Sequence, residues 1–318
     1  MSVRPSCLYS IEPEYYRRMR STTRTGLYTA VALVVLGAAV VAVQRLRPAD
    51  LDRLPSKPPD TRILYGSDEL QFGELRLPKG SGPFPLAVVI HGGCWMSRFA
   101  TLQNTAAMAD ALRDDGIATW NIEYRRSDNP GGGWPGTLAD VADGTDRVRA
   151  IAREHPIDLS KVITIGHSAG AHLALWAAAR KRLTKDSPLF RDNPLPLRAA
   201  VALGGPGDLR DFYTYAQNIC GSNVIDRLMG GSPDSVPERY AQGSPVELLP
   251  TGIRQVLIVG EDDGVMPQKS RTAYQAAATK AGDRIEVMEV PGGHFEVIAP
   301  TTDAGRAVRR KVLELMTK

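Results

Sequence analysis

The sequence predicts an α/β fold in which a mostly parallel sheet is covered by helices on both faces. Short apolar runs, as expected for strands buried on both faces, alternate with segments of helical pattern along residues 61–318. One of these strands passes into an alanine-rich segment through residues 166–170 (GHSAG), a turn typical of such sheets. A chain of 318 residues can bury one large core together with a small cap.

The expected elements follow in chain order. Residues 61–65 and 70–77 alternate in polarity and predict two short strands at an antiparallel edge of the sheet. Buried strands are expected at residues 86–90, 117–124, 161–165, 199–203, 255–259 and 285–290. Helices are expected at residues 101–114, 137–155, 171–180, 267–281 and 302–316. The pattern lapses between residues 204 and 251, which predicts a cap over about residues 205–250.

An uncharged apolar run occupies residues 27–43, behind a basic segment (residues 1–26) that carries Arg17, Arg18, Arg20 and Arg24. A helix over this run would be about 26 Å long, close to the ~30 Å hydrocarbon core of a bilayer. It fits a retained signal anchor or a signal peptide cleaved after residues 40–42 (VVA), and a buried core helix is the third interpretation. Both membrane interpretations place the rest of the chain outside the cytoplasm, either membrane-anchored or exported.

A proline-rich stretch follows at residues 44–60, with prolines at positions 48, 55, 58 and 59. Proline lacks the amide donor and restricts the backbone, so we expect an extended linker here. The folded domain is accordingly expected to cover residues 61–318.

Charge and cysteine content argue against a nucleic-acid-binding protein, a zinc protein and a small disulfide-rich protein. The net charge of +4 is a small excess, and no basic stripe with interleaved aromatic residues indicates a nucleic-acid partner. Cys7, Cys94 and Cys220 have neither zinc-site spacing nor the pattern of a disulfide framework, although a bridge between Cys94 and Cys220 remains possible. We therefore expect no bound metal ion. The sequence does not indicate an oligomeric state.

Ser168 is the central residue of the GHSAG turn. A strand that enters a helix through G-x-S-x-G forms a nucleophile elbow, in which a tight turn exposes the serine hydroxyl. A side chain at Gly166 or Gly170 would crowd the neighbouring backbone, so glycine is expected at both positions. Ser168 is the candidate nucleophile.

A serine nucleophile needs a histidine and an acid. In sheets that carry the serine on such an elbow, both residues come after the serine in the chain. His91, His155 and His167 precede Ser168, and His172 lies on the helix just after it, which leaves His294. His294 follows the strand at residues 285–290 on a glycine-containing loop, where its ring could reach a distant hydroxyl.

The acid is expected on the loop after residues 255–259, which reads GEDDGVMP. A carboxylate there would hold the Nδ1–H of the histidine and stabilise the imidazolium. We choose Asp263, before the turn at Gly264, with Asp262 as the alternative. Asp208 is a weaker third candidate that we interpret as a cap-loop residue.

The loop after residues 86–90 reads His91-Gly92-Gly93-Cys94-Trp95. Consecutive glycines allow backbone amides to approach a developing oxyanion, and each such donor contributes roughly 3 kcal/mol. The expected donors are the amides of Gly93, Cys94 and Ala169, although two glycines after a strand can also form a simple turn. We expect the Cys94 side chain to serve packing, and Trp95 to contact the substrate.

These motifs resemble a known family. HGGCW fits HGGxW, and residues 166–173 (GHSAGAHL) and 294–298 (HFEVI) are similar to the matching stretches of kynurenine formamidase-like α/β-hydrolases and related HGG esterases. The resemblance covers about residues 61–318 and implies an α/β-hydrolase fold, no cofactor, and an oxyanion hole that includes Gly93 and Cys94. The apolar N-terminal run and Gly264, where such loops often carry proline, depart from the family pattern.

The expected function is that of a serine hydrolase of the carboxylesterase type. It would cleave small acyl esters through Ser168, His294 and Asp263, with an acyl-enzyme intermediate. The first alternative is an arylformamidase acting on N-formyl amides such as N-formylkynurenine. An alternative of another class is a non-catalytic binding domain with the same fold, which a missing triad member would favour.

Overall fold

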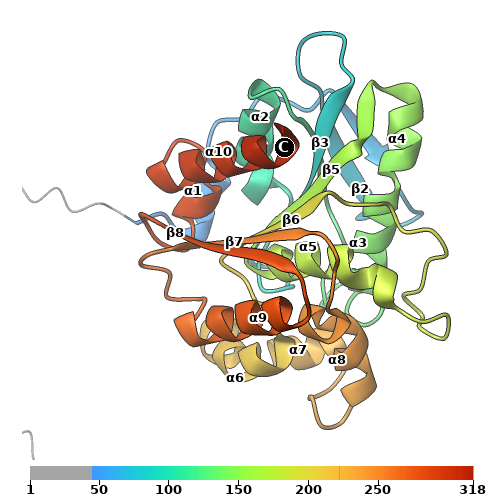
Figure 1. The fold of residues 1–318 in the computed structure, drawn as a ribbon, viewed down its shortest axis with the longest axis vertical. Helices are drawn as coiled ribbons and strands as arrows, with labels where there is room; N and C mark the ends of the chain where they lie inside the picture. The colour runs from blue at the N-terminus through green and yellow to red at the C-terminus, as the bar shows by residue number, and fades with distance from the viewer. Residues whose placement is uncertain (1–44, 222, 318) are drawn as a thin grey trace, which may run out of the picture. The chain divides into compact units, whose positions relative to one another are not determined.

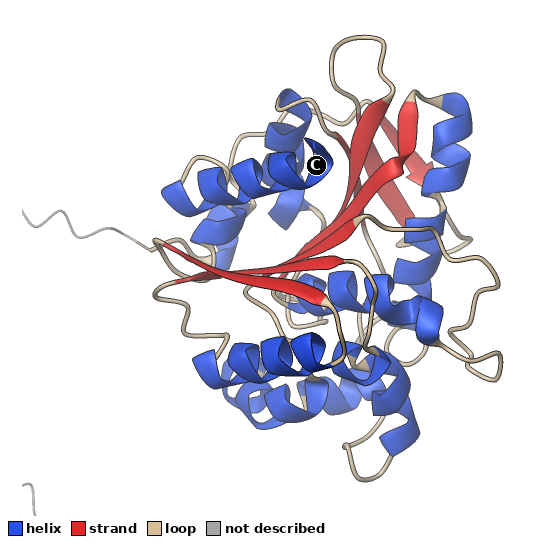
Figure 2. Cartoon of the chain, in the orientation of Figure 1, coloured by secondary structure: helices blue, strands red, loops and turns tan. Residues whose placement is uncertain are grey.

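The computed structural model describes residues 45–221 and 223–317. An eight-stranded sheet with the strand order β1-β2-β4-β3-β5-β6-β7-β8 lies at its centre (Figure 1, Figure 2). The strands are β1 (Thr61–Leu64), β2 (Phe72–Arg76), β3 (Phe84–Ile90), β4 (Ala118–Ile122), β5 (Ile157–His167), β6 (Ala199–Leu203), β7 (Arg254–Gly260) and β8 (Arg284–Val290). β2 runs antiparallel to both β1 and β4, and all other neighbours are parallel. The predicted mostly parallel sheet with an antiparallel edge is confirmed.

Helices cover both faces of the sheet (Figure 1). The α-helices are α1 (Pro48–Leu51), α2 (Gln103–Asp114), α3 (Gly136–Asp146), α4 (Val148–Glu154), α5 (Ala169–Ala179), α6 (Leu209–Cys220), α7 (Val224–Met229), α8 (Pro237–Gly243), α9 (Gln268–Lys280) and α10 (Asp303–Thr317). Short 3-10 helices are η1 (Arg180–Arg182), η2 (Pro245–Leu248) and η3 (Glu296–Ile298). The predicted helix at residues 137–155 is two helices that meet at Arg147, and Gly144, a poor helix former, lies in the last turn of α3.

Strand β3 explains why the central strands read as continuous apolar runs. Ala87 and Val89 pack into the core beneath α2 and α10, whereas Leu86, Val88 and Ile90 pack into the core beneath α3 and α5. All five side chains are fully buried. Because successive side chains point to opposite faces, a strand covered on both sides has to be apolar at every position.

The predicted cap is present as α6, α7, α8 and η2, between β6 and β7. Helix α6 has an apolar side that joins the core through Leu209, Phe212, Ala216 and Cys220. Asp208 caps its first turn, where the carboxylate accepts hydrogen bonds from the amides of Arg210 and Asp211. The interpretation of Asp208 as a cap-loop residue therefore agrees with its contacts.

The stretch before β1 differs from the extended linker expected at residues 44–60. Pro48 begins helix α1, a position where proline is tolerated because its missing amide needs no partner. Leu51, 1% exposed, packs into the same core as α2 and α10. The described residues from Arg45 onward belong to one compact unit, so the folded domain begins well before Thr61.

The apolar run at residues 27–43 lies outside the described residues. Within residues 45–221 and 223–317, no helix combines the length and apolar character that crossing a bilayer requires.

Candidate active site

Four loops at the carboxyl ends of parallel strands carry the candidate residues. Gly93 and Cys94 follow β3, Ser168 follows β5, Asp263 follows β7 and His294 follows β8. Parallel strands end at one edge of the sheet, which is where α/β proteins bind ligands. A cavity of about 150 Å³ lies there; Ser168, His294, Gly93 and Cys94 contribute to its walls. The other residues that line it are Pro48, Phe99, Asn104, His167, Ile219, Val265 and Phe295.

Ser168 sits in a backbone conformation that few non-glycine residues adopt, with φ 54° and ψ −119°. Such a conformation costs on the order of 1–3 kcal/mol and persists only where the surroundings enforce it. A Cβ on Gly166 would lie 1.9 Å from the carbonyl oxygen of Gly170, and one on Gly170 would lie 2.2 Å from that of Ile90. The predicted need for glycine at both positions is confirmed.

His294 pairs with Asp263 and not with Asp262. The Nδ1–H of His294 donates to Oδ2 of Asp263 at 2.9 Å, and the Asp263 side chain is completely buried. Its Oδ1 accepts hydrogen bonds from the amides of Val265 and Met266 at 2.7 and 3.1 Å. The Asp262 side chain is 61% exposed and forms a surface ion pair with Arg45.

Electrostatics keep Asp263 ionised. Burial raises the pKa of its carboxyl, but the hydrogen bond and charge of His294, with the two amides, outweigh burial and leave the pKa below its ordinary value. A carboxylate held in this way fixes the histidine with its proton on Nδ1 and leaves Nε2 to exchange a proton with another group.

A second histidine, His167, is hydrogen-bonded to the backbone of His294. His167, the last residue of β5, donates its Nε2–H to the carbonyl oxygen of His294 at 2.8 Å, and the two rings lie 4.7 Å apart. Burial, and then the nearby charge of His294, lower the pKa of His167 to about 3. His167 is therefore neutral near pH 7 and adds no positive charge beside His294.

The HGGCW loop turns through three consecutive left-handed residues, Gly93 (φ 95°), Cys94 (φ 52°) and Trp95 (φ 53°). A Cβ on Gly93 would lie 2.8 Å from that of Ala100. In the described part of the chain, the amides of Gly93 and Cys94 donate to no protein group. Ala169 is the first residue of α5, where a backbone amide has no partner within the helix. The three amides expected to bind an oxyanion thus lack protein acceptors.

The BD-FAE family model matches residues 74–277, which include the HGGCW loop, Ser168 and Asp263. The chain belongs to the BD-FAE family.

Curated relatives of this family member are esterases. It is 23% identical over 260 residues to a probable isoprenylcysteine alpha-carbonyl methylesterase, ICME, of Oryza sativa subsp. japonica, and 24% identical over 246 residues to esterase LipQ of Mycobacterium tuberculosis. The alignments cover 79% and 73% of this chain but only 61% and 55% of those proteins.

Solved structures with the same fold include a truncated carbohydrate esterase from gut microbiota, with a TM-score of 0.68 at 22% identity, covering 82% of this chain and all of that one. Esterase B of Lactobacillus rhamnosis aligns with a TM-score of 0.68 at 16% identity, covering 84% of this chain and 89% of that one. The predicted α/β-hydrolase fold is confirmed.

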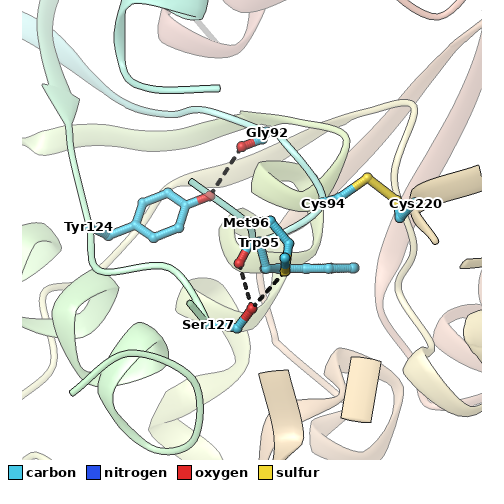
Figure 3. Close-up of a disulfide and its surroundings, with 7 residues drawn as sticks. All are labelled: Gly92, Cys94, Trp95, Met96, Tyr124, Ser127 and Cys220. Atoms are coloured by element: carbon cyan, nitrogen blue, oxygen red, sulfur yellow. Dashed lines mark hydrogen bonds between the residues drawn. A yellow bond between two sulfur atoms is a disulfide. The ribbon is translucent and has the colours of Figure 1, made fainter. Parts of the chain in front are cut away.

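The Cys94 side chain in the HGGCW loop of this BD-FAE domain packs against the core, as expected, and also forms the disulfide with Cys220 that the sequence left possible (Figure 3). The expectation that Trp95 contacts the substrate was wrong. Trp95 does not line the cavity. Its side chain is 1% exposed and packs edge-to-face on His172, with ring centroids 5.5 Å apart. The left-handed turn at Cys94 and Trp95 leaves the indole in the core beside α5.

A buried polar cluster behind the loop was not foreseen. Nε2 of His91 lies 2.8 Å from Oε1 of Glu123, which also accepts from Arg126 at 2.7 Å. The Tyr124 hydroxyl donates to the carbonyl oxygen of His91 at 2.9 Å. Burial alone would raise the pKa of the Glu123 carboxyl, but the charges of His91 and Arg126 bring it below its ordinary value. Glu123 lies near the end of the strand expected at residues 117–124 and Arg126 just after it, and these charged residues at the end of a buried strand were the available signal.

The segment before β1 also reaches the site. Pro48 lines the cavity together with Asn104, whose side-chain amide donates to the Pro48 carbonyl oxygen at 3.2 Å. The buried Glu296 accepts the amide of Leu46 at 2.7 Å and that of Gly293, next to His294, at 2.9 Å. Sequence reasoning missed these residues because the contacts that bring the segment before β1 to the site join positions 56 and 250 residues apart.

Within the described residues, no group of three or more histidine, cysteine or acidic side chains is arranged to hold a metal ion.

Proposed function

We propose that this protein is a serine hydrolase of the carboxylesterase type that cleaves small acyl esters. One observation carries the proposal: Ser168, in its strained turn, lines the same cavity as His294, and His294 is bonded to the buried carboxylate of Asp263. The esterase names of the curated relatives support the reaction class.

In the proposed reaction, Oγ of Ser168 attacks the acyl carbon while Nε2 of His294 takes the hydroxyl proton. Asp263 stabilises the imidazolium that forms. The amides of Gly93, Cys94 and Ala169 bind the oxyanion of the tetrahedral intermediate. Its collapse breaks the bond to the alcohol, which leaves with the proton from His294.

Deacylation repeats these steps with water. The water oxygen attacks the acyl carbon of the acyl-enzyme while Nε2 of His294 accepts a proton from the water. When the bond to Ser168 breaks, His294 gives that proton to Oγ of Ser168. The net products are a carboxylic acid and an alcohol.

The purified protein should hydrolyse short p-nitrophenyl esters with a burst of p-nitrophenol, and a fluorophosphonate probe should label Ser168. Ser168→Ala should lose at least about a thousandfold in kcat and all labelling. Labelling of another residue would refute Ser168 as the nucleophile, and no labelling with intact folding would point instead to a non-catalytic domain.

We propose esters over N-formyl amides as substrates because the curated relatives carry esterase names. A panel of acetyl, butyryl and octanoyl p-nitrophenyl esters beside N-formylkynurenine tests this choice. A kcat/KM for N-formylkynurenine above that of every ester would reverse it.

We further propose that residues 27–43 anchor the protein in a membrane, or direct its export, with the hydrolase domain outside the cytoplasm. The arginines before this apolar run support this orientation. The Cys94–Cys220 disulfide adds support, since disulfides persist mainly in oxidising compartments.

Cell fractionation with sequencing of the mature N-terminus tests the localisation. An intact N-terminus in a carbonate-resistant membrane fraction indicates an anchor, and a new N-terminus near residue 43 indicates cleavage. An intact protein in the cytosolic fraction would contradict both.

A further inference from the structure

The disulfide joins two parts of the active site that are far apart in the chain (Figure 3). Cys94 and Cys220 are separated by 126 residues, and their Cα atoms lie 5.8 Å apart. Cys94 belongs to the HGGCW loop and supplies one of the proposed oxyanion-binding amides. Cys220 is the last residue of α6 in the cap. One covalent bond therefore connects the proposed oxyanion hole to the cap.

On the loop side, backbone hydrogen bonds restrain the residues after Cys94. The amide and the hydroxyl of Ser127 both donate to the carbonyl oxygen of Trp95 at 2.8 Å, and the amide of Met96 donates to that of Gly93 at 2.9 Å. Cys94 itself is left-handed although it carries a side chain. Such a conformation persists only where its surroundings determine it, and the bond from the Cys94 side chain to Cys220 supplies a restraint at that residue.

On the cap side, the bond holds the end of α6 against the cavity. Ile219, the residue before Cys220, lines the cavity and is still 38% exposed. Asp208 caps the other end of the helix, and Cys220 is buried beside the loop. The disulfide thus restrains the end of the helix that carries Ile219 in the cavity wall.

We propose that Cys220 is a positioning residue of the active site. Through its disulfide it holds the Cys94 amide in the oxyanion-binding conformation and Ile219 in the cavity wall, so the enzyme reaches full activity only in the oxidised state. This inference rests on the proposed esterase function. Cys94 is partly exposed at the cavity, which gives a small dithiol access to the bond.

The test uses the full-length chain with Cys7→Ser, so that Cys94 and Cys220 are its only cysteines. Dithiothreitol reduces the bond to two thiols and is itself oxidised to the cyclic disulfide. Hydrolysis of p-nitrophenyl acetate is measured before reduction, after reduction and after reoxidation, with circular dichroism at each stage. Cys220→Ser is measured in parallel, with and without dithiothreitol.

We expect reduction to lower kcat at least about tenfold, since complete loss of one oxyanion donor costs about a hundredfold or more. KM for this small ester should change less, reoxidation should restore kcat, and Cys220→Ser should resemble the reduced enzyme and not respond to dithiothreitol. If the disulfide had a merely structural role, its reduction would lower the melting temperature and leave kcat unchanged at a temperature where the protein is folded.

Two results would overturn the inference. One is a kcat within twofold of the oxidised value in the folded, reduced enzyme, and the other is a peptide map without the Cys94–Cys220 link. If Cys220→Ser does not fold, the reduction and reoxidation of the folded parent decide the outcome. An oxidised parent that carries the link but neither hydrolyses esters nor labels at Ser168 would refute the proposed function, and the inference with it.

Discussion

Burial distinguishes Asp262 from Asp263, although the two carboxylates are neighbours in one loop. Asp263 has no exposed side-chain surface and accepts three hydrogen bonds, from His294, Val265 and Met266. Asp262 faces solvent beside Arg45, where screening by water makes an ion pair worth little. Only the buried, hydrogen-bonded carboxylate of Asp263 can orient a histidine.

We predict that Asp263→Asn lowers kcat by about 10²- to 10⁴-fold, because an amide in place of the carboxylate no longer fixes the Nδ1–H tautomer of His294 or stabilises its charged form. Asp262→Asn, the matched control, should stay within about threefold of the parent. Steady-state kinetics on p-nitrophenyl butyrate provide the comparison. Equal, mild losses in both variants would mean that another residue serves as the acid.

The nucleophile elbow at residues 166–170 is packed so tightly that added side-chain atoms would collide with neighbouring backbone. Helix α5 begins so close to β3 that a Cβ on Gly170 would lie 2.2 Å from the carbonyl oxygen of Ile90 and 2.5 Å from that of His91. The loop after β6 is equally tight, since a Cβ on Gly205 would lie 2.0 Å from the carbonyl oxygen of Ser168. These contacts hold Ser168 in its strained conformation.

Gly170→Ala should destabilise the protein by about 3 kcal/mol or more, because the backbone of β3 cannot move away from the added methyl group. Gly264→Ala is the control, since a Cβ there meets nothing within 4 Å. Urea unfolding, or soluble yield if Gly170→Ala does not fold, measures the difference. Similar stability of the two variants would show that the elbow is less tightly packed than we describe.

The segment that contains α1 is a second element with a role in the site. It is joined to the loop of His294 through Glu296, which accepts amide hydrogen bonds from both segments. Loss of this carboxylate leaves two amides without acceptors close to His294, the proposed catalytic base.

We predict that Glu296→Ala lowers the free energy of unfolding by about 1–3 kcal/mol, the cost of leaving buried donors unsatisfied. It should also reduce kcat severalfold, because Gly293 precedes His294. Glu296→Gln, which keeps one acceptor oxygen, should lie between the parent and Glu296→Ala. Denaturant unfolding and ester kinetics of the three proteins test this order, and an alanine variant equal to the parent would refute it.

At the scale of the whole molecule, two buried histidines make the stability of the fold depend on pH in the acidic range. Burial lowers the pKa of His172 to about 4, and burial with the charge of His294 lowers that of His167 to about 3, from the ordinary value of 6.5. Between these values the unfolded chain binds protons that the folded chain excludes. Stability is therefore unaffected by these groups above pH 6.5 and falls as the pH drops below it.

Each of the two histidines should contribute a loss of about 1.4 kcal/mol per pH unit between about pH 6 and pH 4.5. His172→Gln can still donate to the carbonyl oxygen of Gly243, which His172 contacts at 2.8 Å, and should remove one of the two contributions. Urea unfolding at pH 7, 6 and 5 measures the slope, with the partly exposed His155→Gln as control. Parallel curves for the parent and His172→Gln would contradict the prediction.

Local rules explain the parts of the fold and site that were predictable. Each central strand is apolar along its length because both faces are covered, and the requirement for glycine at positions 166 and 170 follows from the turn alone. The choice of His294 followed from the order of elements along the chain. These features depend on residues that are close in sequence or on chain order, so one sequence is enough to infer them.

The sequence by itself determined the α/β sheet, the elbow at Ser168 and the candidate histidine and acid loops. Only the tertiary structure separated Asp263 from Asp262, joined Cys94 to Cys220, turned Trp95 into the core and brought Pro48 to the cavity. The physical reason is that periodicity and steric limits act between neighbours in the chain. Burial and pairing depend on which distant segments the folded chain brings together.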